Sequence, residues 1–102
     1  MQISPAEYLE LSRREPLVLF DVRSPSELRI VRIEGSLALD EEGLDHLLDL
    51  PRETPVAFLC HHGIRSQRAA LDAAADGFLR LYNIAGGIDA WSRTVDPRLP
   101  RY

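Results

Sequence analysis

The sequence predicts an α/β fold in which a parallel β-sheet is flanked by helices on both faces. Apolar runs at residues 17–22 and 56–59 are nearly continuous, as is typical of strands that are covered on both faces. Segments with helix caps and helical periodicity separate such runs. Because strands and helices alternate in this way, right-handed crossovers between parallel strands are expected.

Two helices in the first half of the chain are predicted to begin in the same way. Ser4–Glu7 and Ser24–Glu27 each read serine, proline, any residue, glutamate. In each segment the serine predicts an N-cap and the proline predicts the first helical residue, with an acid in the first turn. The first helix is expected to end before Pro16. A brief strand at residues 37–39 and an amphipathic helix that Pro51 ends should follow.

The second half of the chain continues the alternation. The alanine-rich run Ser66–Ala75 predicts a tightly packed helix with its serine as the N-cap and Gly77 as the stop signal. A final strand is expected at residues 78–84, followed by a turn of two glycines and a closing helix at residues 88–95. The tail, residues 96–102, is expected to be extended.

Length and composition indicate a single domain over residues 1–102. With 45% hydrophobic and 27% charged residues, the 102-residue chain can bury one core. No run approaches the roughly 20 apolar residues that a membrane span needs, and no secretory signal is visible, so a soluble, cytoplasmic protein is expected. A net charge of −4 argues against a nucleic-acid partner, because no broad basic face is available.

The single cysteine, Cys60, is the residue that says most about function. It stands where the apolar run 56–59 gives way to a helix, and such a junction offers free backbone N–H groups and the positive end of the helix dipole to a thiolate. Gly63 allows backbone angles that turn successive N–H groups inward as an anion-binding nest, and Arg65 adds a permanent positive charge. These features predict thiolate chemistry on a sulfur or phosphorus centre. One cysteine also excludes an internal disulfide, which fits a reducing compartment.

Three other interpretations of this segment are open. A lone cysteine at the end of a strand is often a small buried core residue. A zinc site would need more ligands, because His61 and His62 diverge as sequence neighbours and His46 is the only other histidine, so neither a metal nor a cofactor is expected. A Cys–His nucleophile pair is conceivable, but neighbouring side chains seldom meet, and the two histidines are expected to shape the rim of the loop.

Three motifs occur in the same order as in a known family. They are Asp21-Val22-Arg23 with Glu27, the loop Cys60–Ser66, and Gly77-Phe78 with Gly86-Gly87 and Trp91. In these motifs the chain resembles the single-domain rhodaneses, which are thiosulfate sulfurtransferase-like proteins. The resemblance implies a rhodanese-like fold and a ping-pong reaction. A cysteine thiolate takes sulfane sulfur from a donor such as thiosulfate, and the persulfide passes it to cyanide or to a thiol, including a protein thiol.

The resemblance also implies roles for the residues of the loop. Cys60 and Arg65 are implied as catalytic residues. The other loop residues are implied as substrate-binding residues: His61, His62, Gly63, Ile64 and Ser66. The negative charge of a persulfide agrees with the expected ring of N–H donors, because such donors stabilise an anion before and during transfer.

One segment departs from the family pattern. Val31–Ser36 stands where the family commonly has Gly-His-Ile-Pro-Gly-Ala, so the rim of the site and the donor preference are not predicted there. Arg32, in this segment, is a candidate for a second anion contact. Asp21 is a candidate for a hydrogen bond to the active-site loop, and Arg23 with Glu27 for an ion pair across a turn, with architectural roles favoured for all three.

Related proteins supply alternative functions. Dual-specificity phosphatases share the fold but place five residues between cysteine and arginine, whereas four separate Cys60 from Arg65, and no acid lies in the loop. An arsenate reductase would need a resolving cysteine. The main alternative is a non-enzymatic persulfide carrier or interaction module that delivers sulfur to a protein partner.

Overall fold

The computed structural model describes residues 1–102 and contains five strands and five helices in alternation. In chain order they are β1 (Gln2–Ile3), α1 (Pro5–Ser12), β2 (Val18–Asp21), α2 (Pro25–Ile30), β3 (Leu37–Ala38), α3 (Glu41–Asp49), β4 (Val56–Leu59), α4 (Ile64–Ala75), β5 (Leu81–Ile84) and α5 (Gly87–Thr94). This order confirms the predicted α/β class. None of the helices combines the length and the apolar character needed to cross a membrane.

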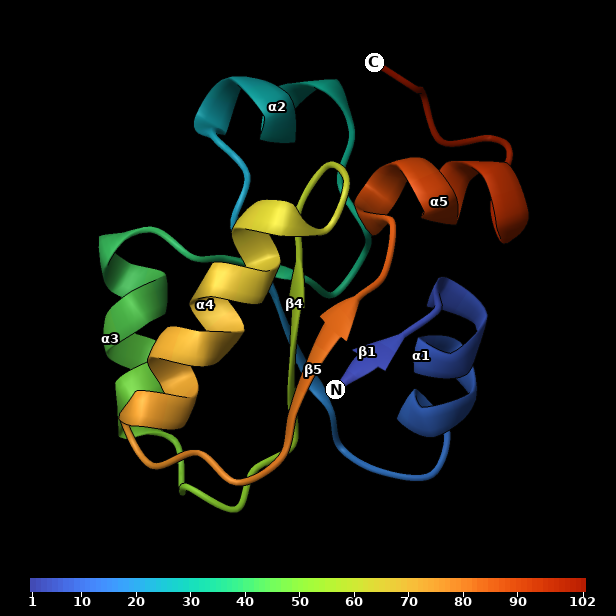
Figure 1. The fold of residues 1–102 in the computed structure, drawn as a ribbon. Coiled ribbons are helices and arrows are strands. Elements are labelled where there is room, and N and C mark those ends of the chain that lie inside the picture. Colours follow the sequence, from blue (N-terminus) through green and yellow to red (C-terminus); the bar gives the residue numbers. More distant parts are fainter.

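All five strands form one parallel sheet in the order β1-β5-β4-β2-β3 (Figure 1). β4 lies in the middle, where Phe58 is in register with Phe20 of β2 and with Asn83 of β5. Because the strands are parallel, their carboxyl ends share one edge of the sheet, and open α/β sheets bind ligands at that edge. Cys60 follows β4 directly at this edge.

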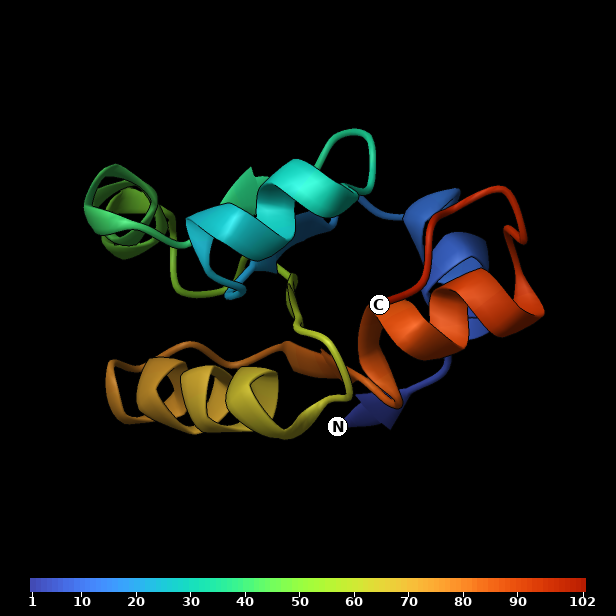
Figure 2. The ribbon, with the colours of Figure 1, turned by 90° about the horizontal axis from the view of Figure 1, so that it is seen from above.

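Helices cover both faces of the sheet, as predicted. Viewed from above, α3 and α4 lie on one side and α1 and α5 on the other (Figure 2). Ala57 and Leu59 of β4 belong to the core under α1 and α5, whereas Val56 and Phe58 belong to the core under α3 and α4. All four side chains are fully buried. Close packing on both faces therefore fixes β4, and β4 in turn fixes the backbone at Cys60.

Serine caps begin α1 and α2, as predicted. Ser4 and Glu7 cap α1 reciprocally, and Ser24 and Glu27 do the same for α2. In α2 the Ser24 N–H donates to Glu27 Oε1 at 3.0 Å, and the Glu27 N–H donates to Ser24 Oγ at 3.3 Å. The cap therefore holds the Glu27 carboxylate at the start of a helix that lies beyond the carboxyl edge of the sheet (Figure 1).

Three elements differ in position from the prediction. β1 has no sequence signal, because a strand of two residues shows no periodicity, and it is held by its pairing with β5. α4 begins at Ile64 rather than after Ser66, and its N-cap is Gly63. Ser66 lies buried in the first turn, where its hydroxyl bonds side chains instead of the helix backbone. β5 covers only the second half of the run at residues 78–84, because the start of that run closes the turn after α4.

The prediction of an extended tail is wrong. The Leu99 N–H donates to the Asp96 carbonyl at 3.1 Å, so the chain turns after α5. The turn returns Tyr102 to the carboxyl edge of the sheet, where its ring stacks on His61 with 3.9 Å between centroids. The prolines of the tail restrict only local backbone angles, whereas this contact joins residues that are far apart in the sequence.

Candidate active site

Cys60 begins a tight loop between β4 and α4. Its Sγ accepts a hydrogen bond from the Gly63 N–H at 3.0 Å and lies 3.2 Å from Ser66 Oγ. The residue is 1% exposed, and it borders a cavity of about 280 Å³ whose other lining residues are His61, His62, Ile64 and Arg65. The structure thus brings together all seven loop residues named from the sequence. Five of them line the cavity, and Gly63 and Ser66 contact the sulfur from within the protein.

The environment of Cys60 favours its thiolate. Burial acts to raise the pKa of the thiol, because it disfavours the charged form. The Ser66 hydroxyl and the backbone N–H groups of Ser66, Gly63 and His62 act in the opposite direction and outweigh burial, so the pKa of Cys60 lies below its ordinary value. The loop therefore stabilises the charged form of the Cys60 thiol even though the side chain is buried.

The Ser66 hydroxyl has one proton to donate and two possible acceptors, Asn83 Oδ1 and Cys60 Sγ. In the structure it donates to Asn83 Oδ1, while its oxygen lies 3.2 Å from Cys60 Sγ. This arrangement suits a neutral Cys60, whose S–H can donate to the serine oxygen. When Cys60 is ionised, the hydroxyl is expected to turn toward Sγ, because a thiolate only accepts hydrogen bonds. Ser66 can therefore serve both protonation states of the cysteine.

The start of α5 holds the carbonyl side of the loop. The Ile88 N–H donates to the Cys60 carbonyl at 2.8 Å, and the Asp89 N–H donates to the His61 carbonyl at 3.1 Å. Gly87 makes this approach possible, since a Cβ there would lie 2.3 Å from the Cys60 oxygen. With its carbonyls bound by α5, the loop backbone presents amides to the sulfur. The glycine pair before α5 thus contributes to the geometry of the site.

Asn83 of β5 is a site residue that sequence reasoning missed. It is 2% exposed, and its Nδ2 donates to the Gly63 carbonyl at 2.9 Å and to Gln2 Oε1 at 3.0 Å. Gly63 itself has φ of +100°, a conformation that favours glycine. Asn83 therefore fixes both the glycine that binds the sulfur and the hydroxyl of Ser66. Its signal in the sequence is a polar amide inside an otherwise apolar strand.

Arg65 is engaged by an acid from α2. Its Nη1 and Nη2 donate to the two carboxylate oxygens of Glu27 at 2.6 and 2.9 Å. The Arg65 guanidinium holds the pKa of Glu27 well below its usual range, and it outweighs burial with the help of hydrogen bonds from Ser24 and Tyr102. The Arg65 side chain is 47% exposed, so the arginine keeps access to solvent.

Two candidate contacts near the first motif are not formed, and the architectural role favoured for Asp21 and Arg23 is confirmed. Arg23 pairs with Asp21 at 2.8 Å, not with the Glu27 carboxylate, and reaches only the Glu27 carbonyl, at 3.2 Å. The Asp21 carboxylate accepts hydrogen bonds from Arg23 rather than from the loop. Both side chains are fully buried, so the pair is part of the architecture. The third candidate, Arg32, contacts the Ser36 carbonyl at 3.4 Å and does not reach the Cys60 cavity.

The two histidines form the rim of the loop as a stack of rings. The His61 imidazole lies between His62, with 3.9 Å between centroids and 28° between planes, and Tyr102, with 3.9 Å and 13°. His61 Nε2 is buried without a hydrogen-bond partner. Tyr102 is the second site residue that sequence reasoning missed, because nothing in the tail indicates that it returns to the loop.

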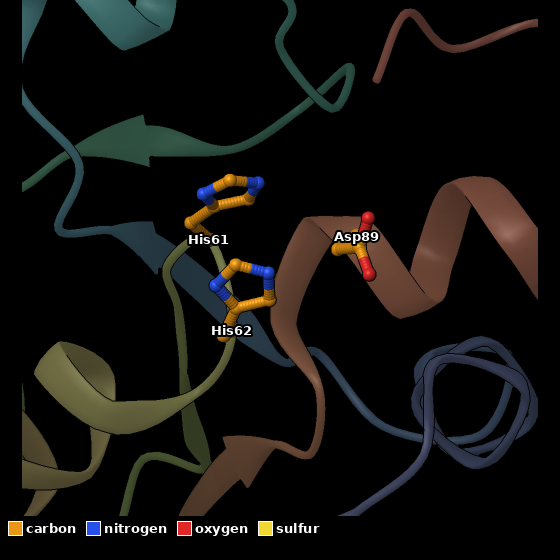
Figure 3. A group of neighbouring side chains, drawn as sticks. All are labelled: His61, His62 and Asp89. Atoms are coloured by element: carbon orange, nitrogen blue, oxygen red, sulfur yellow. The ribbon is translucent and has the colours of Figure 1, made fainter. Parts of the chain in front are cut away.

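The histidines also approach Asp89 of α5 (Figure 3). One possible metal-ligand atom from each of the three residues lies within 4.8 Å of the other two. The two imidazole planes are nearly parallel, however, so their in-plane lone pairs do not converge on one point. Asp89 is already paired with Arg93 at 3.0 Å and with Arg101 at 3.2 Å. This group is therefore a stacked and ion-paired cluster whose geometry suits a metal ion poorly.

Comparison with known proteins finds one family model that matches nearly the whole chain. Residues 4–94, from the N-cap of α1 to the last residue of α5, match the family model of the rhodanese-like domain. Over 100 residues the chain is 33% identical to the thiosulfate sulfurtransferase GlpE of Pseudoalteromonas translucida, in a match that covers 97% of this chain and 95% of the relative.

Two further relatives carry similar names. The chain is 33% identical, over 91% of its length, to the adenylyltransferase and sulfurtransferase uba4 of Ogataea parapolymorpha, of which the match covers 24%. Among solved structures, the polysulfide-sulfur transferase homodimer of Wolinella succinogenes has a TM-score of 0.73 and 29% identity. That match covers 91% of this chain and 73% of the solved one.

Proposed function

The chain belongs to the rhodanese-like domain family, and from this membership we propose that it is a sulfurtransferase that carries sulfane sulfur on Cys60. The observation that carries the proposal is the Gly63 N–H, 3.0 Å from Cys60 Sγ, in a loop that lowers the pKa of the thiol. The amide that binds a thiolate also stabilises the charge of a persulfide. Relatives named as sulfurtransferases support the same reaction class.

Loading begins with attack of the Cys60 thiolate on the outer sulfur of thiosulfate. A new S–S bond forms at Cys60, the S–S bond within thiosulfate breaks, and sulfite leaves with the electron pair. The charge balances, because a thiolate and a dianion give a persulfide anion and a sulfite dianion. Arg65 is proposed to attract the anionic donor and to offset its charge beside the thiolate. A related persulfide could load the cysteine in the same way.

Discharge regenerates the thiolate. Cyanide or an acceptor thiolate attacks the outer sulfur of the persulfide, the bond to Cys60 breaks, and Cys60 leaves as a thiolate. The loop amides stabilise this leaving group as they stabilised the nucleophile. The atoms and charges of the whole cycle balance with only the thiolate, the donor and the acceptor, so the proposed reaction uses no cofactor. A reducing compartment such as the cytoplasm would keep the free thiol available.

A protein thiol is a second candidate for the acceptor, and one observation favours it. Ile64 lines the cavity beside Cys60 and is 81% exposed, so an apolar side chain meets solvent at the entrance of the site. An apolar residue beside the sulfur gives a protein partner a contact that thiosulfate or cyanide cannot use. Under this proposal the persulfide is delivered to a cysteine of another chain.

Intact-protein mass spectrometry after thiosulfate treatment tests the proposed function. The expected result is one added sulfur atom that cyanide removes. Cys60→Ser is expected to remain folded and to gain no sulfur, since a hydroxyl is far less nucleophilic than this thiol. Absence of the adduct in the unmodified chain, or equal thiosulfate turnover by the serine variant, would contradict the proposal. Release of phosphate from an aryl phosphate would instead indicate a phosphatase.

A further inference from the structure

The hydroxyl of Tyr102 joins two ion pairs beside the candidate active site. It donates to Glu27 Oε2 at 2.8 Å and accepts from Arg23 Nη1 at 3.1 Å. Glu27 holds Arg65 through both carboxylate oxygens, and Arg23 is paired with Asp21 at the end of β2. A continuous series of charge-assisted hydrogen bonds therefore runs from the sheet to the Arg65 guanidinium and passes through Tyr102.

The ring of Tyr102 contacts the same site from a second direction. It stacks on His61 with 3.9 Å between centroids and 13° between planes, and His61 stacks on His62 in turn. Since His61 Nε2 is buried without a partner, ring contacts rather than hydrogen bonds hold this imidazole. Tyr102 itself is 38% exposed. Its replacement would therefore alter the site without leaving a void in either core.

Two effects of the hydroxyl act in the same direction on an anionic donor. The hydroxyl restrains the Glu27 carboxylate, which in turn orients Arg65. By donating a hydrogen bond it also offsets part of the carboxylate's negative charge, so that less charge opposes a dianion. We therefore propose that Tyr102 is a positioning residue that makes the site selective for small anionic sulfur donors. This inference rests on the proposed function, because donor choice has meaning only for a sulfurtransferase.

The ring adds a limit on donor size. His61 and His62 border the cavity of about 280 Å³ at Cys60, and Tyr102 packs on the face of His61 that His62 leaves free. Without the ring, the His61 side chain loses one of its two ring stacks. A larger donor, such as glutathione persulfide, then gains access to the sulfur. The inference therefore predicts a loss of discrimination between donors rather than a loss of sulfur transfer.

Two variants of Tyr102 separate the hydroxyl from the ring. Tyr102→Phe removes both hydrogen bonds and keeps the stack. It is expected to raise KM for thiosulfate about threefold to tenfold, the factor that a lost hydrogen bond commonly gives, with kcat changed by less than about twofold. Tyr102→Ala also removes the stack, and it is expected to raise kcat/KM for glutathione persulfide relative to that for thiosulfate.

A matched control and a coupling test distinguish positioning from general disturbance of the tail. Arg98→Ala is the control, since the side chain of Arg98 bonds only Asp96 within the same tail, and it should change neither KM nor donor preference. In a Glu27→Ala background, Tyr102→Phe should have no further effect on KM, because the hydroxyl acts through that carboxylate. An unchanged thiosulfate KM in Tyr102→Phe, or an equal increase in the Glu27→Ala background, would overturn the inference.

Imidazole proton shifts give a reading that does not depend on turnover. His61 should show a ring-current shift that Tyr102→Phe preserves and Tyr102→Ala reduces to the part that comes from His62. His46→Gln and His62→Gln assign the signals of the chain's three histidines. A His61 signal that does not respond to Tyr102→Ala overturns the inference whether or not sulfur is transferred. A chain with the expected His61 response that gains no sulfur from thiosulfate contradicts the proposed function instead.

Discussion

Ser66 shows how one residue can serve a cysteine in two charge states. Its hydroxyl donates to Asn83 Oδ1 while its oxygen lies 3.2 Å from Cys60 Sγ. Turning the same hydroxyl toward the sulfur would give a thiolate a second hydrogen-bond donor besides the Gly63 N–H. The amide of Asn83 stays in place meanwhile, because its Nδ2 bonds the Gly63 carbonyl and Gln2. Rotation of this one hydroxyl group would therefore be enough to add a hydrogen bond to the charged sulfur.

Ser66→Ala is expected to raise the pKa of Cys60. The thiolate then loses one donor, while burial, which disfavours it, is unchanged. At a pH below both pKa values the thiolate fraction falls in the variant, and above both values it is the same. The rate of iodoacetamide alkylation should fall roughly tenfold at the acid end of the pH profile and converge with that of the parent at high pH, as loss of a hydrogen bond to a charged group predicts. Coincident pH profiles would contradict this role.

Arg65→Ala is expected to weaken the use of anionic donors in particular. The change removes a cation beside the thiolate and leaves the Glu27 carboxylate without its partner. Thiosulfate, a dianion, should show a KM raised about tenfold or more, since charge-assisted contacts of this kind commonly contribute 1.5–3 kcal/mol. A neutral donor such as an organic trisulfide should be used nearly as before. Equal losses with both donors would show that Arg65 acts on the cysteine rather than on the donor.

The loop between β4 and α4 owes its shape to an element that follows it in the sequence. The first N–H groups of α5 would otherwise lack partners, and they bind the carbonyls of Cys60 and His61. The N–H groups of α5 and the carbonyl groups of the loop thereby become each other's hydrogen-bond partners. A helix N-terminus often binds an anion, whereas here it binds the carbonyl side of a loop whose Gly63 N–H donates to Cys60 Sγ. Gly87 is the residue that allows the two segments to approach so closely.

Gly87→Ala is therefore expected to damage both stability and activity. A Cβ at this position would lie 2.3 Å from the Cys60 carbonyl and 2.4 Å from that of His61, and the backbone has φ of +63°. Gly35→Ala is the matched control, because Gly35 has φ of +85° but open space around it. The control should cost about 1 kcal/mol from backbone strain alone. Gly87→Ala should cost roughly 3 kcal/mol or more and also slow sulfur loading. Equal midpoints in urea for the two variants would contradict the account.

The elements that the sequence predicted well are those with local signals. The serine and proline caps of α1 and α2 and the apolar run of β4 act within a few residues, and all three are confirmed. The candidate site was predicted from local signals too, because its cysteine, glycine and arginine are neighbours in one loop. Asn83 and Tyr102 reach that loop from other elements. Their contacts depend on sheet order and on the turn after α5, neither of which has a local signal.

At the scale of the whole molecule, α2 is attached to the protein in an unusual way. None of its residues is buried, so it lacks the apolar face that holds most helices on a sheet. Arg23 supplies polar contacts instead. It binds Asp21 at the end of β2, donates to the Glu27 carbonyl at 3.2 Å, and donates to the Val31 carbonyl at 2.6 Å just after the helix. One buried guanidinium thus joins α2, which carries Glu27, to the sheet that carries the cysteine.

Asp21→Asn tests this dependence on a buried charge. The variant keeps the size of the side chain but leaves the Arg23 guanidinium buried without a counter-charge, and both side chains are fully buried in the parent. Such a loss commonly costs about 3 to 5 kcal/mol, a large part of the roughly 5–15 kcal/mol that stabilises a domain. Glu10→Gln is the control, because the Glu10–Arg13 pair is exposed and should contribute about 1 kcal/mol at most.

Urea unfolding of the two variants gives the comparison, and hydrogen exchange shows where the loss is felt. If Arg23 attaches α2 to the sheet, amides in residues 25–31 should exchange faster in Asp21→Asn under native conditions, while those of β4 should change only with global stability. Because α2 carries Glu27, the same variant should raise KM for thiosulfate even where the domain remains folded. If Asp21→Asn lowers the urea midpoint no more than Glu10→Gln does, α2 is held by its caps alone.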